Sequence, residues 1–286
     1  MKPLKEARVA ILGLGLMGGS LAAALTGQCR SITACDPQPD SLEFARAQGW
    51  VQQATDDPHQ AVAEADLVIL AAPVRTILTL LANLSGSFPP GCLVMDLGST
   101  KQEIARQMEQ LPSAVECLGG HPMCGKEKSG VRFAEASLFR GRRFLLTPLA
   151  RTSPAGLQAG TELALALGAE PQVVDPARHD RLVATSSHLP YLIACGLVDT
   201  ASGLAREDPL VWQVAASGFR DTSRLAGSSV AMMTDILITN RPAVLAAVRA
   251  YQEDLGRLAY LLENGDEAGL AELLHQIQSI REGLFP

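Results

Sequence analysis

Charged residues are scarce in this chain, and basic residues are the scarcer kind. Asp, Glu, Lys and Arg together make up 19% of the 286 residues. The 24 Lys and Arg are outnumbered by 30 Asp and Glu, so the formal net charge is −6. Arg140, Arg142 and Arg143 form the one tight basic cluster. Because a nucleic-acid-binding protein usually shows a basic balance or a basic stripe, we expect no nucleic-acid partner.

Paired cysteines are also absent. The six cysteines include no Cys-x-x-Cys pair, which favours reduced thiols in the cytoplasm over a disulfide framework. His121 and Cys124 have a His-x-x-Cys spacing, with Cys117 nearby. Since no second ligand pair accompanies them, we favour core thiols over a metal site and expect no metal.

The sequence lacks an apolar run of the ~18 residues that a membrane span needs, so we expect no membrane association. Basic residues before an apolar run that ends near Ala24 superficially resemble a signal peptide. Four glycines between positions 13 and 19 would break the apolar helix of such a signal. A strand, a turn and a helix explain their spacing better.

The most informative stretch is Val9 to Ser20, which reads VAILGLGLMGGS. An apolar strand runs into a glycine that allows a tight turn, a second that lets a pyrophosphate approach the backbone, and a third that lets the following helix pack closely. The helix N-terminus then offers free N–H groups to the phosphates. We therefore predict a dinucleotide site. Its predicted cofactor-binding residues are Gly13, Gly15, Leu16, Met17, Gly18, Ala72 and Pro73.

Asp36 indicates which dinucleotide is bound. It ends a second predicted strand, 31–35, at 18 residues after Gly18, close to the ~20 expected for the acid that binds an adenosine ribose. A carboxylate there accepts hydrogen bonds from the ribose hydroxyls and repels a 2′-phosphate. The alternative is a loop aspartate before Pro37. With the glycine turn in front, we favour the ribose role and predict NAD as the cofactor.

The predicted fold class is α/β. Strand and helix patterns alternate up to residue 175, and continuous apolar runs such as 65–73 are typical of a parallel sheet covered on both faces. After that point only helices are predicted, and the first, 177–205, is broken or bent at Pro190. We predict a Rossmann-type doubly wound domain over 1–175 and an all-helical substrate and dimerisation domain over 176–286. Apolar helical sets commonly pack against a second copy, so we expect a homodimer.

Two residues at strand ends are candidates for chemistry, because the ligand crevice of a parallel sheet lies at the carboxyl ends of its strands. Ser99 fits the N-cap of a helix that starts at Thr100, with Gln102 in a capping-box position, and this role is compatible with a functional one. His121 follows two glycines and precedes a proline. An imidazole is the natural base near neutral pH, although a loop histidine alone is also often structural.

The helical part adds a second histidine, His188, and two arginines four residues apart, Arg220 and Arg224. If their segment is helical, the arginines share one face. One reading pairs an arginine with Asp221 and leaves the other in solvent. The other has an arginine that grips a substrate carboxylate in a bidentate fork.

Five motifs, in this order, resemble the prephenate and arogenate dehydrogenases of tyrosine biosynthesis. They span residues 9 to 224 and read GLGLMGGS, DLGSTK, GGHPMCG, SHLPY and GFRDTSR. Together they are very specific for the family, although the glycine turn alone is not. The resemblance implies a Rossmann domain, a helical dimerisation domain and an NAD-dependent enzyme that converts prephenate to 4-hydroxyphenylpyruvate and CO₂.

The resemblance also implies residue roles. His121 is the base for the ring hydroxyl at C4, from which hydride leaves for the nicotinamide, and Ser99 orients that hydroxyl and His121. His188 lines the substrate pocket, Arg224 holds the ring carboxylate, and Arg220 assists it.

The loop after His121 bears on the substrate. Its Glu-Lys-Ser-Gly, which begins at Glu127, resembles the prephenate-using branch, in which the glutamate gates the pocket. Arogenate dehydrogenase is the alternative, and a non-catalytic NAD sensor is a more remote one. The β-hydroxyacid dehydrogenases resemble this layout, but they use a lysine from the second half of the chain, and residues 152–286 contain none.

Overall fold

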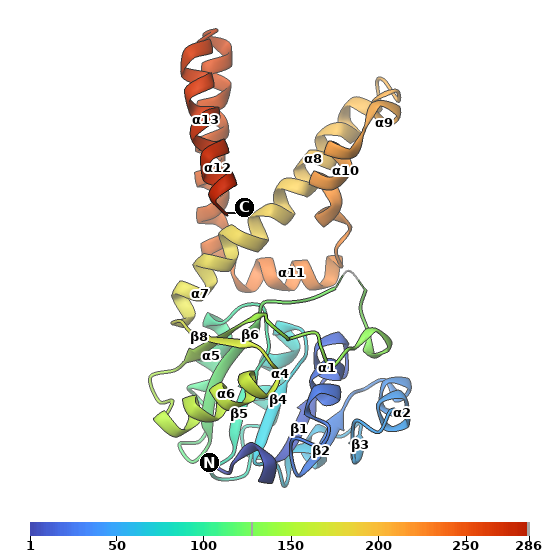
Figure 1. The fold of residues 1–286 in the computed structure, drawn as a ribbon. Coiled ribbons are helices and arrows are strands. Elements are labelled where there is room, and N and C mark those ends of the chain that lie inside the picture. Colours follow the sequence, from blue (N-terminus) through green and yellow to red (C-terminus); the bar gives the residue numbers. More distant parts are fainter. Residues whose placement is uncertain (127, 285–286) are drawn as a thin grey trace. The chain divides into compact units, whose positions relative to one another are not determined.

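The computed structural model describes residues 1–126 and 128–284. By their contacts these residues form two compact units, which divide between Asn240 and Arg241. The first unit therefore holds the whole sheet together with the helices between 176 and 240 (Figure 1). The division of the sequence into domains after residue 175 stays a prediction.

One eight-stranded sheet forms the centre of the first unit, with the strand order β3-β2-β1-β4-β5-β6-β7-β8. Neighbouring strands are parallel except that β7 runs antiparallel to β6. The reversal of strand order between β1 and β4 is the topological switch point at which such sheets bind ligands. The strands are β1 Arg8–Leu12, β2 Ser31–Cys35, β3 Gln53–Thr55, β4 Leu67–Leu70, β5 Leu93–Asp96, β6 Glu116–Pro122, β7 Arg143–Pro148 and β8 Glu170–Val173.

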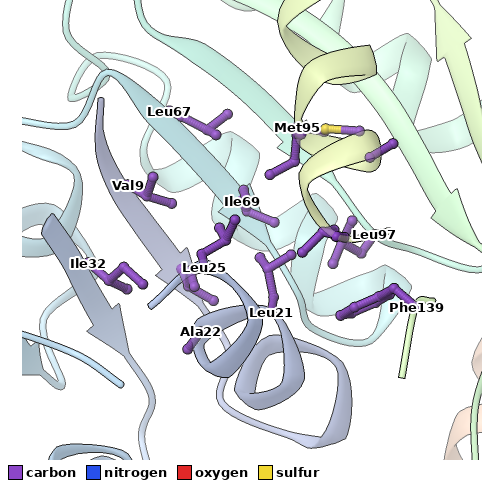
Figure 2. Close-up of a cluster of buried hydrophobic side chains, with 14 of the residues drawn as sticks. Val9, Leu21, Ala22, Leu25, Ile32, Leu67, Ile69, Met95, Leu97 and Phe139 are labelled. Atoms are coloured by element: carbon purple, nitrogen blue, oxygen red, sulfur yellow. The ribbon is translucent and has the colours of Figure 1, made fainter. Parts of the chain in front are cut away.

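Two hydrophobic clusters, one on each face of the sheet, confirm the doubly wound prediction. Alternate residues of β1 divide between them, with Val9 and Ile11 in one cluster and Ala10 and Leu12 in the other. Helices α1, α2 and α6 cover the first face, and α3, α4 and α5 cover the second. Figure 2 shows Leu21, Ala22 and Leu25 of α1 in the first cluster. These helices are α1 Leu16–Leu25, α2 Pro39–Ala47, α3 Pro58–Val62, α4 Val74–Asn83, α5 Gln102–Met108 and α6 Pro154–Ala166.

Helices α7 (Pro176–Val183) and α8 (Leu189–Ala205) are joined by a π-helical turn, Ala184–His188. The N–H of Leu189 donates to the carbonyl of Ala184, five residues earlier. Pro190, the predicted point of a break or bend, is the second residue of α8 and follows this turn closely. The widened turn carries His188, and such turns often occur at functional sites.

The helical run Pro176–Ala205 is also, among the described residues, the one long and apolar enough to cross a membrane by length and composition. One such run is weak support for a membrane span. The same run contains the fully buried side chains of His179 and Asp180, which hydrogen-bond within the first unit.

The remaining helices of the first unit pack onto this framework. The predicted helix 209–226 is three short pieces instead, α9 (Val211–Val214), α10 (Ser217–Ser223) and the 3₁₀ turn η4 (Arg224–Gly227). Helix α11 (Val230–Thr239) contacts α4, and Arg75 Nε lies 3.1 Å from Asp235 Oδ1. The second unit consists of α12 (Arg241–Glu263) and α13 (Glu267–Leu284).

Candidate active site

The glycine turn follows β1 at the switch point. Gly13 has a φ of 102°, and a Cβ there would overlap the carbonyl oxygen of Ala71, so this position requires glycine. The N–H of Gly13 donates to the carbonyl of Cys35 at 2.7 Å, which holds the turn against the end of β2. Ala72 and Pro73 lie directly beyond Ala71 at the end of β4, so they border the same turn.

Gly15 differs from Gly13, because a Cβ at Gly15 would meet nothing within 4 Å. It is the N-cap of α1 and provides no side-chain hydrogen bond to the first turn, in which Leu16 and Met17 are half-buried. Open space beside a helix N-terminus without a side-chain cap fits a pyrophosphate group. The residues present therefore suit a dinucleotide.

Asp36 lies directly after β2 and contacts the glycine turn through Leu14. Its side chain is 8% exposed, Oδ2 accepts a hydrogen bond from the N–H of Leu14 at 2.7 Å, and Oδ1 accepts one from the N–H of Gln38 at 2.9 Å. A carboxylate oxygen can accept more than one hydrogen bond. The carboxylate is therefore oriented by the backbone beside the glycine turn and retains acceptor capacity for ribose hydroxyls.

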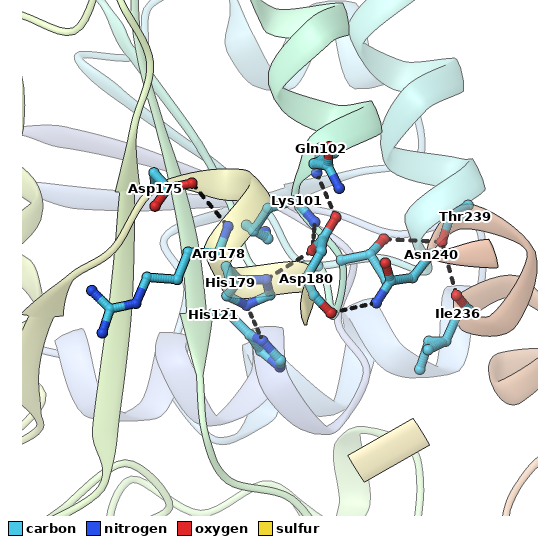
Figure 3. Close-up of polar contacts among 12 residues, drawn as sticks. Lys101, Gln102, His121, Asp175, Arg178, His179, Asp180, Ile236, Thr239 and Asn240 are labelled. Carbon is cyan, nitrogen blue, oxygen red and sulfur yellow. Dashed lines mark hydrogen bonds and ion pairs between the residues drawn. The ribbon is translucent and has the colours of Figure 1, made fainter. Parts of the chain in front are cut away.

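His121 lies near the end of β6, and its ring contacts the ring of His179 from α7 (Figure 3). His121 Nδ1 is 2.8 Å from His179 Nε2, and His179 Nδ1 is 2.9 Å from Asp180 Oδ1. His121 is half-buried, whereas His179 and Asp180 are fully buried. Burial, with nearby His179, Lys101 and His188, holds the pKa of His121 well below its ordinary value. The imidazole is therefore neutral at pH 7, the state that a base requires.

Asp180 also caps α5, and this corrects the predicted cap. Its Oδ1 accepts a hydrogen bond from the N–H of Lys101 at 2.7 Å, and its Oδ2 accepts one from the N–H of Gln102 at 2.9 Å. Helix α5 begins at Gln102 with Lys101 as its N-cap, so the prediction of Ser99 as the cap of a helix starting at Thr100 is wrong. The carboxylate from α7 supplies the acceptors instead. Ser99 is half-buried in the loop between β5 and α5.

A buried ion pair between Lys101 and Asp96 also holds the loop between β5 and α5. Lys101 Nζ contacts Asp96 Oδ2, donates to the carbonyl of Gly120 at 2.7 Å, and is fully buried together with Asp96. Burial lowers the pKa of Lys101, and the charge of Asp96 opposes that effect. The pair joins the end of β5, the strand that precedes Ser99, to the end of β6, the strand that carries His121.

His188 is 2% exposed. Its Nδ1 lies 3.3 Å from Nδ2 of Asn240, whose side chain also donates to the carbonyl of Asp180 at 2.8 Å. Because the amide nitrogen is a donor, Nδ1 of His188 acts as the acceptor and Nε2 carries the ring proton. Burial lowers the pKa of His188 to about 4. His188 is thus a neutral hydrogen-bond donor through Nε2.

The two arginines are exposed. Arg220 Nε lies 3.3 Å from Asp221 Oδ1, which matches the reading in which one arginine pairs with that aspartate. Arg224 is the first residue of η4, which packs against α8, the helix that follows His188. Glu127, the predicted gate, lies outside the described residues.

Sequence reasoning missed His179, Asp180 and Asn240. His179-Asp180 follows the Asp175-Pro176 start of α7, and nothing in its spacing to His121 predicts a contact across 58 positions. The signal that could have found the pair is its polarity, since two ionisable residues stand on the helix face that packs against the sheet. A buried charge requires a partner.

A glycine turn at the switch point, a backbone-held aspartate beside it and a neutral histidine at the same edge define the class of the protein. It is an NAD-dependent dehydrogenase with a Rossmann-type sheet. Comparison with known proteins gives the family. Residues 21–173 match the family model described as prephenate dehydrogenase, nucleotide-binding domain, and residues 175–276 match that described as prephenate dehydrogenase, dimerization domain. The chain belongs to the prephenate dehydrogenase family.

Individual members of the family are similar to this chain over nearly its whole length. Prephenate dehydrogenase of Bacillus subtilis is 32% identical over 288 residues, which cover 99% of this chain and 77% of that protein. The crystal structure of prephenate dehydrogenase from Aquifex aeolicus with hydroxyphenyl propionate and NAD⁺ has a TM-score of 0.91 at 30% identity, and the match covers 99% of this chain and 100% of that one. Synechocystis arogenate dehydrogenase has a TM-score of 0.86 at 31% identity, covering 97% and 99%. The predicted family is confirmed.

Proposed function

We propose that this enzyme catalyses the NAD-dependent oxidative decarboxylation of prephenate to 4-hydroxyphenylpyruvate and CO₂ in tyrosine biosynthesis. The observation that carries the proposal is the half-buried imidazole of His121 at the edge of the sheet that also carries the glycine turn, where burial holds its pKa well below the ordinary value. Such a base near a hydride acceptor suits the oxidation of an alcohol.

In this proposal the residues of the chain act as follows. His121 takes the proton of the C4 hydroxyl through Nε2, and Ser99 orients that hydroxyl. His188 donates a hydrogen bond to the substrate through Nε2, and Arg224, with Arg220 beside it in the chain, holds the ring carboxylate. When bound, NAD supplies the acceptor for the hydride.

The reaction balances without a further reactant. The O–H and C–H bonds at C4 break, the proton goes to His121, and the hydride leaves as C4 becomes a carbonyl carbon. The bond between C1 and the carboxylate then breaks, and its electron pair enters the ring, which becomes aromatic. The former carbonyl oxygen takes up a proton from His121, and the pyruvyl side chain remains unchanged.

The functional form is proposed to be a cytoplasmic homodimer. Exposed apolar side chains in the helices of both units support this, because large exposed apolar surfaces mark interaction sites. All six cysteines are free, which suits a reducing compartment. The exposed apolar residues include Leu204, Val214 and Val230 in the first unit and Leu255, Leu262 and Ile280 in the second.

Arogenate, which carries an alanyl side chain where prephenate has a pyruvyl one, is the second candidate substrate. The likeness to the Synechocystis arogenate dehydrogenase favours it. The Glu127 loop motif favours prephenate, and we retain prephenate as the proposed substrate.

Product analysis tests the proposal. Purified enzyme is mixed with prephenate and NAD, and NADH, CO₂ and 4-hydroxyphenylpyruvate are measured together. We expect equal molar amounts of the three products. NAD binding without any product, while arogenate also gives none, would exclude a dehydrogenase of this pathway and favour an NAD sensor.

A further inference from the structure

We propose that His179 and Asp180 are positioning residues that hold His121 in the tautomer with a free Nε2 and tie this base to the loop that carries Ser99. The proposal rests on the proposed function, in which His121 takes the substrate proton. It assigns a role to two fully buried residues outside the motifs that identified the family.

The chain of hydrogen bonds determines where each proton lies. His179 Nδ1 faces the carboxylate oxygen Oδ1 of Asp180 at 2.9 Å, and an ionised carboxylate only accepts, so His179 Nδ1 carries a proton. We assign this single proton to His179, which leaves its Nε2 as an acceptor. His121 Nδ1, 2.8 Å away, must donate to it. His121 therefore holds its proton on Nδ1, and its Nε2 has the free lone pair.

The carboxylate of Asp180 is suited to begin this chain. Burial alone would raise the pKa of Asp180, but hydrogen bonds from His179 and from the N–H groups of Gln102 and Lys101 lower it. The group is thus charged although its side chain has no exposed surface. Charge-assisted hydrogen bonds of this kind are the strong ones in proteins.

One carboxylate also joins two parts of the site. Asp180 Oδ1 accepts from both His179 Nδ1 and the N–H of Lys101, and Oδ2 accepts from the N–H of Gln102 (Figure 3). The loop that contains Ser99 leads directly into these two N–H groups. The position of His121 from β6 and the position of Ser99 after β5 are therefore set by the same side chain of α7.

The arrangement also places a negative charge near the base. Burial is the strongest influence against a positive charge on His121, and the charge of Lys101 adds to it. Asp180, across the ring of His179, opposes them, while the charge of Lys101 is compensated by Asp96. The Asp180 carboxylate thus stabilises the imidazolium that forms during the reaction, as the orienting carboxylate of a hydrolase triad does.

Nitrogen NMR of histidine-labelled enzyme measures the tautomer directly. The chain has five histidines, so the spectrum is simple to assign by single substitutions. In the free enzyme we expect His121 to be neutral with its proton on Nδ1. In His179→Phe, which keeps a ring but removes the acceptor, this preference should be lost. A proton on Nε2 of His121 in the wild-type enzyme would overturn the proposal.

Kinetics of matched variants give the second readout. His179→Phe should lower kcat by on the order of 10²-fold with little change in KM, whereas His179→Gln, whose side-chain oxygen can still accept from His121, should lose less than about 10-fold. His59→Gln removes an exposed histidine that hydrogen-bonds to Ser87 and is the control. NAD affinity, measured by titration, should match the wild type in all three and verifies folding.

The outcomes separate this proposal from the proposed function. Failure of the wild-type enzyme to oxidise prephenate, with the Nδ1–H tautomer present, would refute the proposed function and leave the tautomer assignment standing. If His179→Phe binds NAD and turns prephenate over at the wild-type kcat, His179 has no positioning role and the proposal is wrong.

Discussion

The Nδ1 atom of His121 lies 2.8 Å from the Nε2 atom of His179, so a histidine from the end of β6 and one from the first helix after the sheet form a single hydrogen-bonded pair. The pair brings the helical part of the first unit to the crevice edge of the sheet. The proposed proton transfer depends on this contact, because it determines which nitrogen of His121 is free to act.

Replacement of His121 by Asn should remove the base and leave the cofactor site intact. We expect kcat to fall by about 10²- to 10⁴-fold, the usual contribution of general acid–base catalysis, while the dissociation constant of NAD stays at its wild-type value. Stopped assays for NADH and a fluorescence titration with NAD measure the two quantities. A variant with near wild-type kcat at pH 7 would refute the assignment of His121 as the base.

Glycines 13 and 15 should behave in opposite ways. Gly13→Ala places a side chain at a φ of 102° against the carbonyl of Ala71, so we expect a loss of several degrees in Tm, consistent with a cost of about 1–3 kcal/mol for such backbone strain. Gly15→Ala enters open space, so Tm should stay unchanged while NAD binds at least about 10-fold more weakly. Equal NAD affinity in Gly15→Ala and wild type would place the pyrophosphate elsewhere.

Much of the sheet and of the proposed cofactor site was predictable from the sequence. The apolar runs of β1, β4 and β5, the glycines and Asp36 are local signals, because each lies within one strand–turn–helix unit. The short edge strand β3 carries no apolar run and was missed. The cap of α5 was assigned to the wrong residue, because local spacing favours Ser99, whereas the carboxylate of Asp180, 78 positions after Gln102, supplies the acceptor. The His121–His179 contact is equally non-local.

His188 should make stability depend on pH. Its pKa is about 4 in the folded protein and near 6.5 when unfolded, so between these values the unfolded chain binds more protons. The associated stability is fully present above pH 6.5 and is lost as pH falls toward 4, by about 3 kcal/mol in total.

Urea unfolding at a series of pH values measures this loss, and His188→Gln is the matched variant. The free energy of unfolding of the wild type should fall more steeply with acid than that of the variant. Parallel curves for the two proteins between pH 6.5 and 4 would contradict the burial of a neutral His188.

The two arginines provide a matched pair for substrate binding. Arg224→Ala should raise KM for prephenate by about 10-fold or more with a smaller change in kcat, because a grip on the carboxylate acts mainly in binding. Arg220→Ala removes an exposed ion pair with Asp221 and should have a smaller effect, since exposed pairs contribute little. An unchanged KM in Arg224→Ala together with a raised KM in Arg220→Ala would move the role to Arg220.

The most direct test of the account is a steady-state comparison of prephenate and arogenate, each with NAD and with NADP, on the wild-type enzyme. It addresses the substrate and the role of Asp36 at once. We predict the highest kcat/KM for prephenate with NAD and a value at least about 10-fold lower with NADP, because the carboxylate of Asp36 repels a 2′-phosphate. A higher kcat/KM for arogenate, or equal values with the two cofactors, would contradict the account.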